Sequence, residues 1–377
     1  MTAPPRTRLM MTADTVGGVW TFAANLSREL GAAGFDVLLV TLGPRPRAAQ
    51  RAMVSGSPGV SLTETDLALE WQDPAGADLL NAQSVLADIA ARFAPQIVHL
   101  NSFREASFGW KAPQIVVAHS CVNSWAAACG ETDAFMGREW RVYTANVRAG
   151  LRQARAWVAP TSTFRDQIAR LYRLPTDGVV IRNGAEDVAE WLQPKQPVIL
   201  GAGRVWDKAK NLTALASVAS MLEWPVRIAG DPGAERQAGA FAGGRFLGEL
   251  SHQELRREFE AASVFVSPAL YEPFGLSVLE AAGAGCALVL SDIPTFRELW
   301  DGAARFFDPR DQDAMVRCLR SLMADAAERT DLQRAAAERA GRYRLTDTVA
   351  AYRSLYHDLL RAGSARPPMR RDEEMIA

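Results

Sequence analysis

Short apolar runs alternate repeatedly with longer helix-like stretches along this sequence, and this alternation limits the folds open to it. In the first half, apolar runs at 36–42, 96–100 and 114–118 alternate with stretches of helical periodicity such as 81–93. Strands that alternate with helices favour a parallel sheet with helices on both faces. The alternation therefore predicts an α/β fold.

A second series of the same kind follows a connector. The segment 191–197 carries Pro194, Lys195 and Pro197, which is typical of a link between domains. Beyond it, the pattern predicts further strands at 198–201, 226–229, 245–247, 264–267 and 287–290, with helices at 211–222, 253–262 and 276–284. Because 377 residues exceed what one hydrophobic core usually organises, we predict two domains.

We therefore divide the chain into two Rossmann-like halves that meet at the connector. The N-terminal half covers 1–192 and the C-terminal half covers 193–345. A last helix over 346–362 is expected to cross back to the N-terminal half, and the charged, proline-containing tail 363–377 is expected to be disordered. Open sheets bind ligands at the carboxyl ends of their strands, so the halves should face each other across a deep cleft.

The segment that carries most chemical information is YEPFGLSVLEA at 271–281. It follows an apolar strand and opens a helix whose first backbone N–H groups lack partners within the helix, which favours a phosphate there. Glu272 would lie in the loop beside the bound group, and Glu280 about two turns into the helix on the side of the cleft. A bare pair of glutamates at this spacing is common on surface helices, but the full segment is not.

A second motif, GAGRVWDKAKN at 201–211, follows the first strand of the C-terminal half. Its opening Gly-x-Gly suggests a dinucleotide site, but Trp206 stands where the third glycine belongs. The loop carries two cations of interest, Arg204 and Lys210, with Lys208 as a competing candidate. Taken alone, these would be exposed basic residues in a loop.

Three further positions in the first half follow predicted strands. Gly17 and Gly18 stand at a strand-to-helix turn, where glycine lets backbone come close to a ligand. His119 ends the apolar run 115–118, and His99 ends another strand as a weaker cleft candidate. No carboxylate or cysteine accompanies the two histidines at a ligand spacing, so no metal site is expected.

Taken together, these segments resemble glycosyltransferase family 4, a retaining family with the GT-B fold. The segment 271–281 has the form of the family's Glu-x7-Glu motif, and 201–211 resembles its Gly-Arg…Lys-Asn element. The resemblance implies catalytic roles for four residues, with His119 and Glu272 at the transferred sugar and Arg204 and Lys210 at the diphosphate.

The same resemblance implies a donor-binding set around these four residues. Glu280 would bind the ribose, the glycine turn would lie against the phosphates, and other backbone groups would contact the sugar, phosphate and base. These donor-binding residues are Gly17, Gly18, Phe274, Gly275, Leu276, Glu280, Gly248 and Glu249.

The resemblance further implies transfer of a hexose from a nucleoside diphosphate sugar, without metal or cofactor. A UDP-sugar is slightly favoured over a GDP-sugar, while the acceptor, a glycan, a lipid-linked molecule or a small molecule, stays open. Two rival functions fit the same cleft: a nucleotide-sugar epimerase or hydrolase, and a non-catalytic nucleotide-sugar binding protein.

The composition limits which partners and which cellular compartment are expected for the protein. A formal net charge of -1 argues against a general nucleic-acid binder. Four cysteines without Cys-x-x-Cys spacing suit free thiols, and no apolar run approaches a membrane span, so we expect a cytoplasmic protein. Arginines recur around Trp140 and Tyr143, so association with the inner face of the membrane stays open beside the simpler reading of a solvated basic surface.

Overall fold

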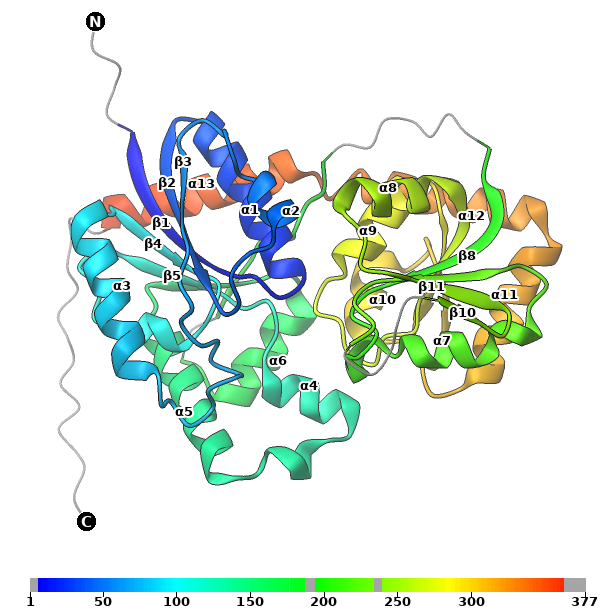
Figure 1. Cartoon of the computed structure of the whole chain (residues 1–377), viewed down its shortest axis with the longest axis horizontal. Helices are drawn as coiled ribbons and strands as arrows, with labels where there is room; N and C mark the ends of the chain where they lie inside the picture. Colours follow the sequence, from blue (N-terminus) through cyan, green and yellow to red (C-terminus); the bar gives the residue numbers. More distant parts are fainter. Residues whose placement is uncertain (1–5, 176, 187–193, 234–238, 363–377) are drawn as a thin grey trace, which may run out of the picture.

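The computed structural model describes residues 6–175, 177–186, 194–233 and 239–362. They form two α/β halves that lie side by side in Figure 1. Each half is built on one seven-stranded sheet, with strand orders β3-β2-β1-β4-β5-β6-β7 and β10-β11-β9-β8-β12-β13-β14. The predicted fold class, with two parallel-sheet α/β halves, is confirmed.

The first sheet is parallel throughout, as expected for strands joined by helical crossovers. Its strands are β1 (Thr7–Asp14), β2 (Phe35–Leu42), β3 (Val60–Thr63), β4 (Ile97–Leu100), β5 (Gln114–Val117), β6 (Ala156–Ala159) and β7 (Val179–Val180). The helices of this half are α1 (Gly18–Ala32), α2 (Ala48–Ala52), α3 (Leu79–Phe93), α4 (Val122–Cys129), α5 (Arg138–Gln153) and α6 (Ser162–Tyr172), with 3-10 turns η1 (Arg104–Ser107) and η2 (Thr132–Phe135).

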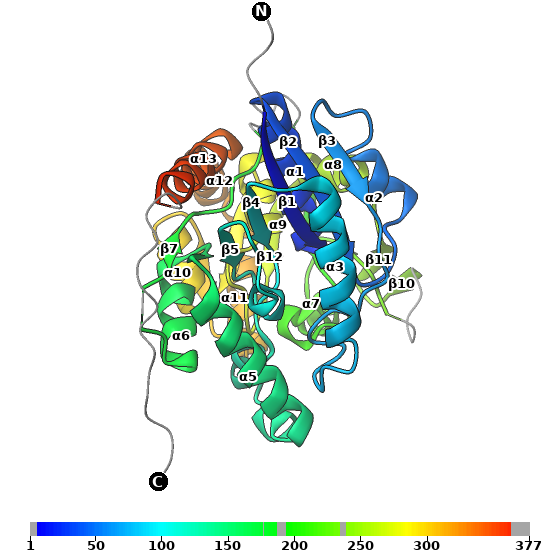
Figure 2. The same ribbon diagram turned by 90° about the vertical axis from the view of Figure 1, so that its left-hand side faces the viewer.

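Alternate side chains of β1 pack on opposite faces of this sheet. Leu9 and Met11 pack in one core with α1 and with α13 (Leu345–Ala362), whereas Met10 packs with α3 in another. This is the strand periodicity expected when both faces are covered. In Figure 2, α13 and α3 accordingly lie on opposite sides of the first sheet.

The second sheet repeats the arrangement with one antiparallel edge, where β10 pairs with β11. Its strands are β8 (Gln196–Ala202), β9 (Val226–Ala229), β10 (Gly239–Phe241), β11 (Gly244–Gly248), β12 (Ala262–Ser267), β13 (Ala287–Ser291) and β14 (Arg305–Phe307). The helices are α7 (Leu212–Val218), α8 (His252–Ala261), α9 (Leu276–Gly283), α10 (Pro294–Trp300), α11 (Gln312–Ala324) and α12 (Ala326–Ala340), with 3-10 turns η3 (Lys208–Lys210) and η4 (Ala219–Met221).

Two stretches of chain run between the halves and contact each other. Ala185 pairs with Arg344, and the backbone N–H of Leu345 donates to Ala185 O at 2.8 Å. A side chain on Gly184 would collide with the backbone at Arg344, so the crossing needs glycine there. Beyond the crossing, α13 packs against α1. The expected boundary at 192/193 and the tail 363–377 lie outside the described residues.

One helix begins at a different residue from the one that the sequence predicts, because a capping side chain determines its start. In the sequence, residues 332–343 look helical, but the helix α12 begins six residues earlier, because the Asp325 carboxylate accepts from the backbone N–H of Glu328 at 2.9 Å and caps it. The short edge strands β3, β10 and β14 were not predicted, since their few residues carry little periodicity. Among the described residues, no helix combines the length and apolar character needed to span a membrane.

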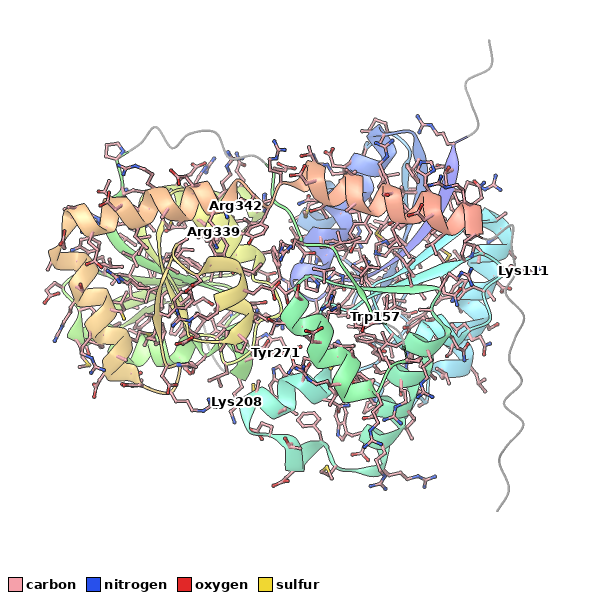
Figure 3. The ribbon with its side chains drawn as sticks, turned by 180° about the vertical axis from the view of Figure 1, so that it is seen from behind. Lys111, Trp157, Lys208, Tyr271, Arg339 and Arg342 are labelled. Atoms are coloured by element: carbon pink, nitrogen blue, oxygen red, sulfur yellow. The ribbon has the colours of Figure 1, made fainter. Side chains whose placement is uncertain are left out.

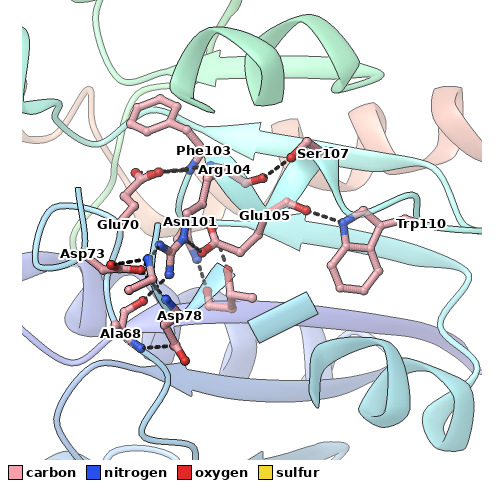
Figure 4. Close-up of polar contacts among 12 residues, drawn as sticks. Ala68, Glu70, Asp73, Asp78, Asn101, Phe103, Arg104, Glu105, Ser107 and Trp110 are labelled. Atoms are coloured by element: carbon pink, nitrogen blue, oxygen red, sulfur yellow. Dashed lines mark hydrogen bonds and ion pairs between the residues drawn. The ribbon is translucent and has the colours of Figure 1, made fainter. Parts of the chain in front are cut away.

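A buried ionic cluster holds the long loop after β3 against the end of β4 (Figure 4). The Arg104 guanidinium, only 1% exposed, contacts Asp73, Glu105 and Ala68 O at 2.9, 2.9 and 2.6 Å. Glu70 accepts from the backbone N–H groups at the start of η1, and burial together with the nearby Glu105 raises its pKa well above the ordinary range. The cluster holds the loop after β3 in a fixed position against η1.

Candidate active site

The two predicted cations lie on the loop that follows β8. Lys210 Nζ is 2.5 Å from Glu272 Oε2, and both side chains are largely buried, at 23% and 12% exposed. Arg204 Nη2 lies 2.6 Å from Asp207 Oδ2. Lys208 is not part of the Lys210–Glu272 pair; its ammonium contacts Glu131 of the N-terminal half. The loop therefore separates Lys210, beside the glutamate motif, from its competitor.

The helix of the glutamate motif begins at Leu276, directly after Gly275. Gly275 has φ +90°, a conformation that other residues rarely adopt, and it turns the chain into α9. The Phe274 side chain, 3% exposed, packs in the core of the C-terminal half, so only its backbone can meet a ligand. Backbone N–H groups at the start of α9 have no partners within the helix, which favours an anion at this point.

The glycine turn of the N-terminal half meets this site from the other side. Gly17 has φ +84° and caps α1, and a Cβ at this position would collide with the Arg204 guanidinium. A Cβ on Gly18 would lie 3.7 Å from Leu276 Cδ1. The N-termini of α1 and α9 therefore face each other, and Arg204 lies between the halves. The two helix N-termini and the guanidinium together make the electrostatic potential positive on both sides of the cleft.

Glu280 lines a cavity between α9, α1 and the crossing segments. Thr21, Asn25, Glu186 and Arg256 share its lining. Burial, with a smaller contribution from the charge of Glu186, raises the pKa of Glu280 to about 7. Since α9 begins at residue 276, Glu280 lies about one turn into the helix, so the expectation of two turns was wrong. Its side chain nevertheless reaches the cavity.

His119 follows β5 and lies against the N-terminal half's own core. Its Nε2 is 2.7 Å from Asn101 Oδ1, and its ring packs edge-on against Phe22 with centroids 4.7 Å apart. Asn101 Nδ2 donates to Thr12 O at 2.6 Å, which leaves Oδ1 as the acceptor for His119 Nε2–H and Nδ1 as the ring's free acceptor. Burial lowers the pKa of His119 to about 3, so the ring is neutral.

His99 is not available to a ligand in the same way. It is fully buried, with Nδ1 2.6 Å from the Tyr356 hydroxyl of α13 and Nε2 3.2 Å from Asn101 Oδ1. The interpretation of His99 as a second cleft residue is therefore wrong. It joins α13 to the sheet.

Gly248 and Glu249, two of the predicted donor-binding residues, lie at the end of β11 and just after it. Gly248 is buried with φ +74°, and its carbonyl accepts from the backbone N–H of Gly230 at 2.8 Å. Glu249 is half exposed and contacts Arg47 of the N-terminal half. This ion pair spans the two halves.

Two acidic residues near Arg204 were not among the sequence candidates. Asp207, 5% exposed, holds Arg204 as described, and its place within the 201–211 motif could have suggested this role. Asp14 ends β1 and accepts from the backbone N–H of Val16 at 2.6 Å. Burial raises the pKa of Asp14 to about 6, although the charge of Arg204 opposes the shift.

No part of the described chain gathers three or more histidine, cysteine, aspartate or glutamate side chains that could hold a metal ion. The Asp311-Gln312-Asp313 sequence instead begins a helix, where Asp311 accepts from the backbone N–H of Ala314 at 2.8 Å. The four cysteines are free thiols.

Models of known protein families match both halves of the chain. Residues 16–187 match the model described as Glycosyltransferase Family 4, and residues 185–339 match the model described as Glycosyl transferases group 1. A glycogen synthase from Mycobacterium tuberculosis is 24% identical over 404 residues, with 94% of each chain covered. A phosphatidyl-myo-inositol mannosyltransferase from Mycolicibacterium smegmatis is 31% identical over 210 residues, covering 50% of this chain and 54% of that one.

Solved structures share the fold at low sequence identity. A sucrose-phosphate synthase from Thermosynechococcus elongatus superposes with a TM-score of 0.77 at 18% identity, covering 95% of this chain and all of the other. Anabaena HepE, solved in complex with UDP-glucose, has a TM-score of 0.71 at 13% identity, with 94% and 100% covered.

Proposed function

This chain belongs to the glycosyltransferases that join a family 4 domain to a group 1 domain, and on that premise we propose that it transfers a hexose from a nucleoside diphosphate sugar with retention. One observation carries the proposal: Arg204, Lys210 and the starts of α1 and α9 converge between the halves. Two cations and two helix N-termini suit a diphosphate, which carries its charge on adjacent phosphoryl groups.

The reaction breaks the bond between the anomeric carbon and the distal phosphate oxygen. Charge develops on that oxygen, and Lys210, Arg204 and the start of α9 stabilise it. The acceptor hydroxyl attacks the same face of the sugar and forms the new glycosidic bond, while its proton passes to the departing phosphate. Glu272 is engaged by Lys210, so we assign it to the sugar hydroxyls and not to a covalent intermediate.

The neutral ring of His119 supports a contact with the transferred sugar. With Nε2–H directed to Asn101, Nδ1 is left to accept a hydrogen bond from a sugar hydroxyl. Glu280 in its cavity suits the ribose. For the base we favour uridine over guanosine, and the UDP-glucose bound by Anabaena HepE supports this choice by fold likeness.

Product analysis tests the proposal against its rivals. The purified chain is incubated with UDP-, GDP- and ADP-sugars and a panel of glycan, lipid and small-molecule acceptors. We expect release of nucleoside diphosphate with formation of an α-linked product from an α-linked donor, undiminished by a chelator. Donor isomerisation or simple hydrolysis would support an epimerase or hydrolase, and binding without turnover a binding protein. An inverted product would refute retention alone.

A further inference from the structure

Helix α4 of the N-terminal half lies directly on the loop that carries the two cations. Trp125 Nε1 donates to Asp207 Oδ1 at 2.9 Å, and Arg310 Nη2 donates to Ala128 O at 3.1 Å. The Lys208 ammonium contacts Glu131 just beyond the helix. These contacts join the halves at the site itself, away from the crossing segments.

The Asp207 carboxylate is shared between the two halves. Its Oδ1 accepts from Trp125 and from the backbone N–H of Ala209, at 2.9 and 3.0 Å, and its Oδ2 accepts from Arg204 Nη2 at 2.6 Å. Burial would raise the pKa of Asp207, but Arg204 and Trp125 hold it below the ordinary range, so the group is ionised. Arg204 Nε is buried without a partner among the described residues, and Asp207 accepts from Nη2 of this guanidinium, which also lies over the Trp206 ring with 5.3 Å from Cζ to the ring centroid.

The beginning of the same helix contacts the glutamate motif. The Tyr271 hydroxyl lies 3.3 Å from the backbone N of Cys121 and 2.8 Å from Ser124 Oγ. Figure 3 shows Tyr271 and Lys208 at the edge of the C-terminal half that faces the N-terminal half. Because His119 precedes α4 by three residues, one short helix is connected to the sugar end and to the phosphate end of the site.

We propose that α4 makes the orientation of Arg204 depend on contact between the two halves. Asp207 is the residue that positions Arg204, and Trp125 of α4 is the residue that links Asp207 to the N-terminal half. The inference rests on the proposed function. Trp125 and Asp207 belong to different halves, so their hydrogen bond forms only when the halves meet. When they separate, Asp207 loses a donor and becomes exposed to water, and Arg204 loses its fixed place opposite Gly17.

The central test removes the indole N–H and keeps the ring. Trp125→Phe preserves the packing against Phe135, whose ring centroid is 5.8 Å away. We expect kcat to fall about tenfold, the effect of losing one hydrogen bond to a charged group, while KM for the donor and Kd for UDP change less than about twofold. Trp140→Phe, in the same aromatic cluster at 4.6 Å from Phe135, is the matched control and should change neither value.

A double-mutant cycle identifies the partner. Asp207→Asn should lower kcat by about a hundredfold, and adding Trp125→Phe to it should cause no further loss, because the shared hydrogen bond is already weakened. Unchanged kcat in Trp125→Phe, or losses that multiply in the double variant, would overturn the coupling. Thermal unfolding of each variant checks that folding is intact.

Small-angle scattering decides the inference without any assay of transfer. With saturating UDP, we expect Trp125→Phe to show a larger radius of gyration than the parent and Trp140→Phe. Equal radii would overturn the role of α4 even in an active enzyme. If the parent chain transfers no sugar from any donor, the proposed function fails, and the scattering result still tests whether Trp125 holds the halves together.

Discussion

Lys210 Nζ and Glu272 Oε2 lie 2.5 Å apart, so the cation assigned to the diphosphate and the carboxylate assigned to the sugar contact each other directly. The pair is mostly shielded from water, which strengthens the attraction and restricts both side chains. The contact therefore holds the cation of one motif against the carboxylate of the other.

Replacing Lys210 by alanine is expected to lower kcat by about a hundredfold, because the variant loses a cation that stabilises the leaving phosphate. Donor KM should change much less. Lys208→Ala is the comparison variant: it removes a cation of the same loop whose ammonium contacts Glu131 and not the glutamate motif, and it should lower turnover far less than Lys210→Ala. Equal losses in the two variants, measured by nucleoside diphosphate release, would contradict the assignment of Lys210.

Glu280 should make nucleotide binding depend on pH. Its pKa is raised to about 7, so the carboxylate that would accept from the ribose is fully ionised only above this value. We expect the affinity for free UDP to rise between pH 6 and pH 8 more in the parent than in Glu280→Gln, which cannot ionise, and to be weaker throughout in Glu280→Ala. Isothermal titration calorimetry at several pH values measures this, and the glutamine variant corrects for titration of the phosphate. Identical pH profiles would remove Glu280 from the ribose site.

The same carboxyl should affect stability in the opposite direction. The folded state keeps its proton up to about pH 7, whereas an unfolded glutamate loses it near 4.5. The contribution of this group to stability is therefore greatest below pH 4.5 and is lost as the pH rises from there through about 7, by on the order of 3 kcal/mol. Without ligand, Glu280→Gln should unfold at a higher denaturant concentration than the parent at pH 8, and at a similar one at pH 5.

Arg104 should be among the most sensitive positions for stability. Arg104→Ala leaves Glu105 and Asp73 without their buried cation, and such a loss typically costs about 3–5 kcal/mol. Urea unfolding measures the change. Arg334→Ala, which removes a cation from an exposed pair with Asp331, is the control and should cost less than about 1 kcal/mol. A small effect at Arg104 would mean that water or a rearranged loop replaces the cluster.

The arginines of α5 and its surroundings allow a test of whether the protein associates with membranes. Arg138, Arg141 and Arg152 are exposed, and Met136, beside the helix, is 62% exposed. Arg47 and Arg51, which follow β2, contact Glu249 and Glu64 and should contribute less. We expect low-salt cosedimentation with anionic vesicles and none with neutral ones, each arginine adding about 1 kcal/mol, and loss of binding in Arg138→Glu/Arg141→Glu. Equal, negligible binding to both vesicles would leave a solvated basic surface.

The sequence was sufficient for the fold because apolar periodicity is a local property. It placed the strands that end at Leu42, Leu100 and Ser267 to within a few residues, and it placed the motifs on the loops that follow strands. It could not supply the pairing of Asp207 with Trp125, because that contact depends on how the two halves meet. Apolar periodicity alone did not separate His99 from His119, since both follow apolar runs; the family resemblance favoured His119, and only the position of α13 shows that His99 is buried.

The return of α13 to the first sheet has a consequence for how the protein is made. Tyr352 and Tyr356 complete the core that contains Leu9 and Met11, yet they are translated after the whole C-terminal half. While the ribosome is still adding that half, the first sheet has one face without its last helix, and His99 has no Tyr356 beside it. The N-terminal half is thus synthesised first, but its hydrophobic core is completed last. A gene cut at the connector would encode an N-terminal piece that lacks part of its own hydrophobic core.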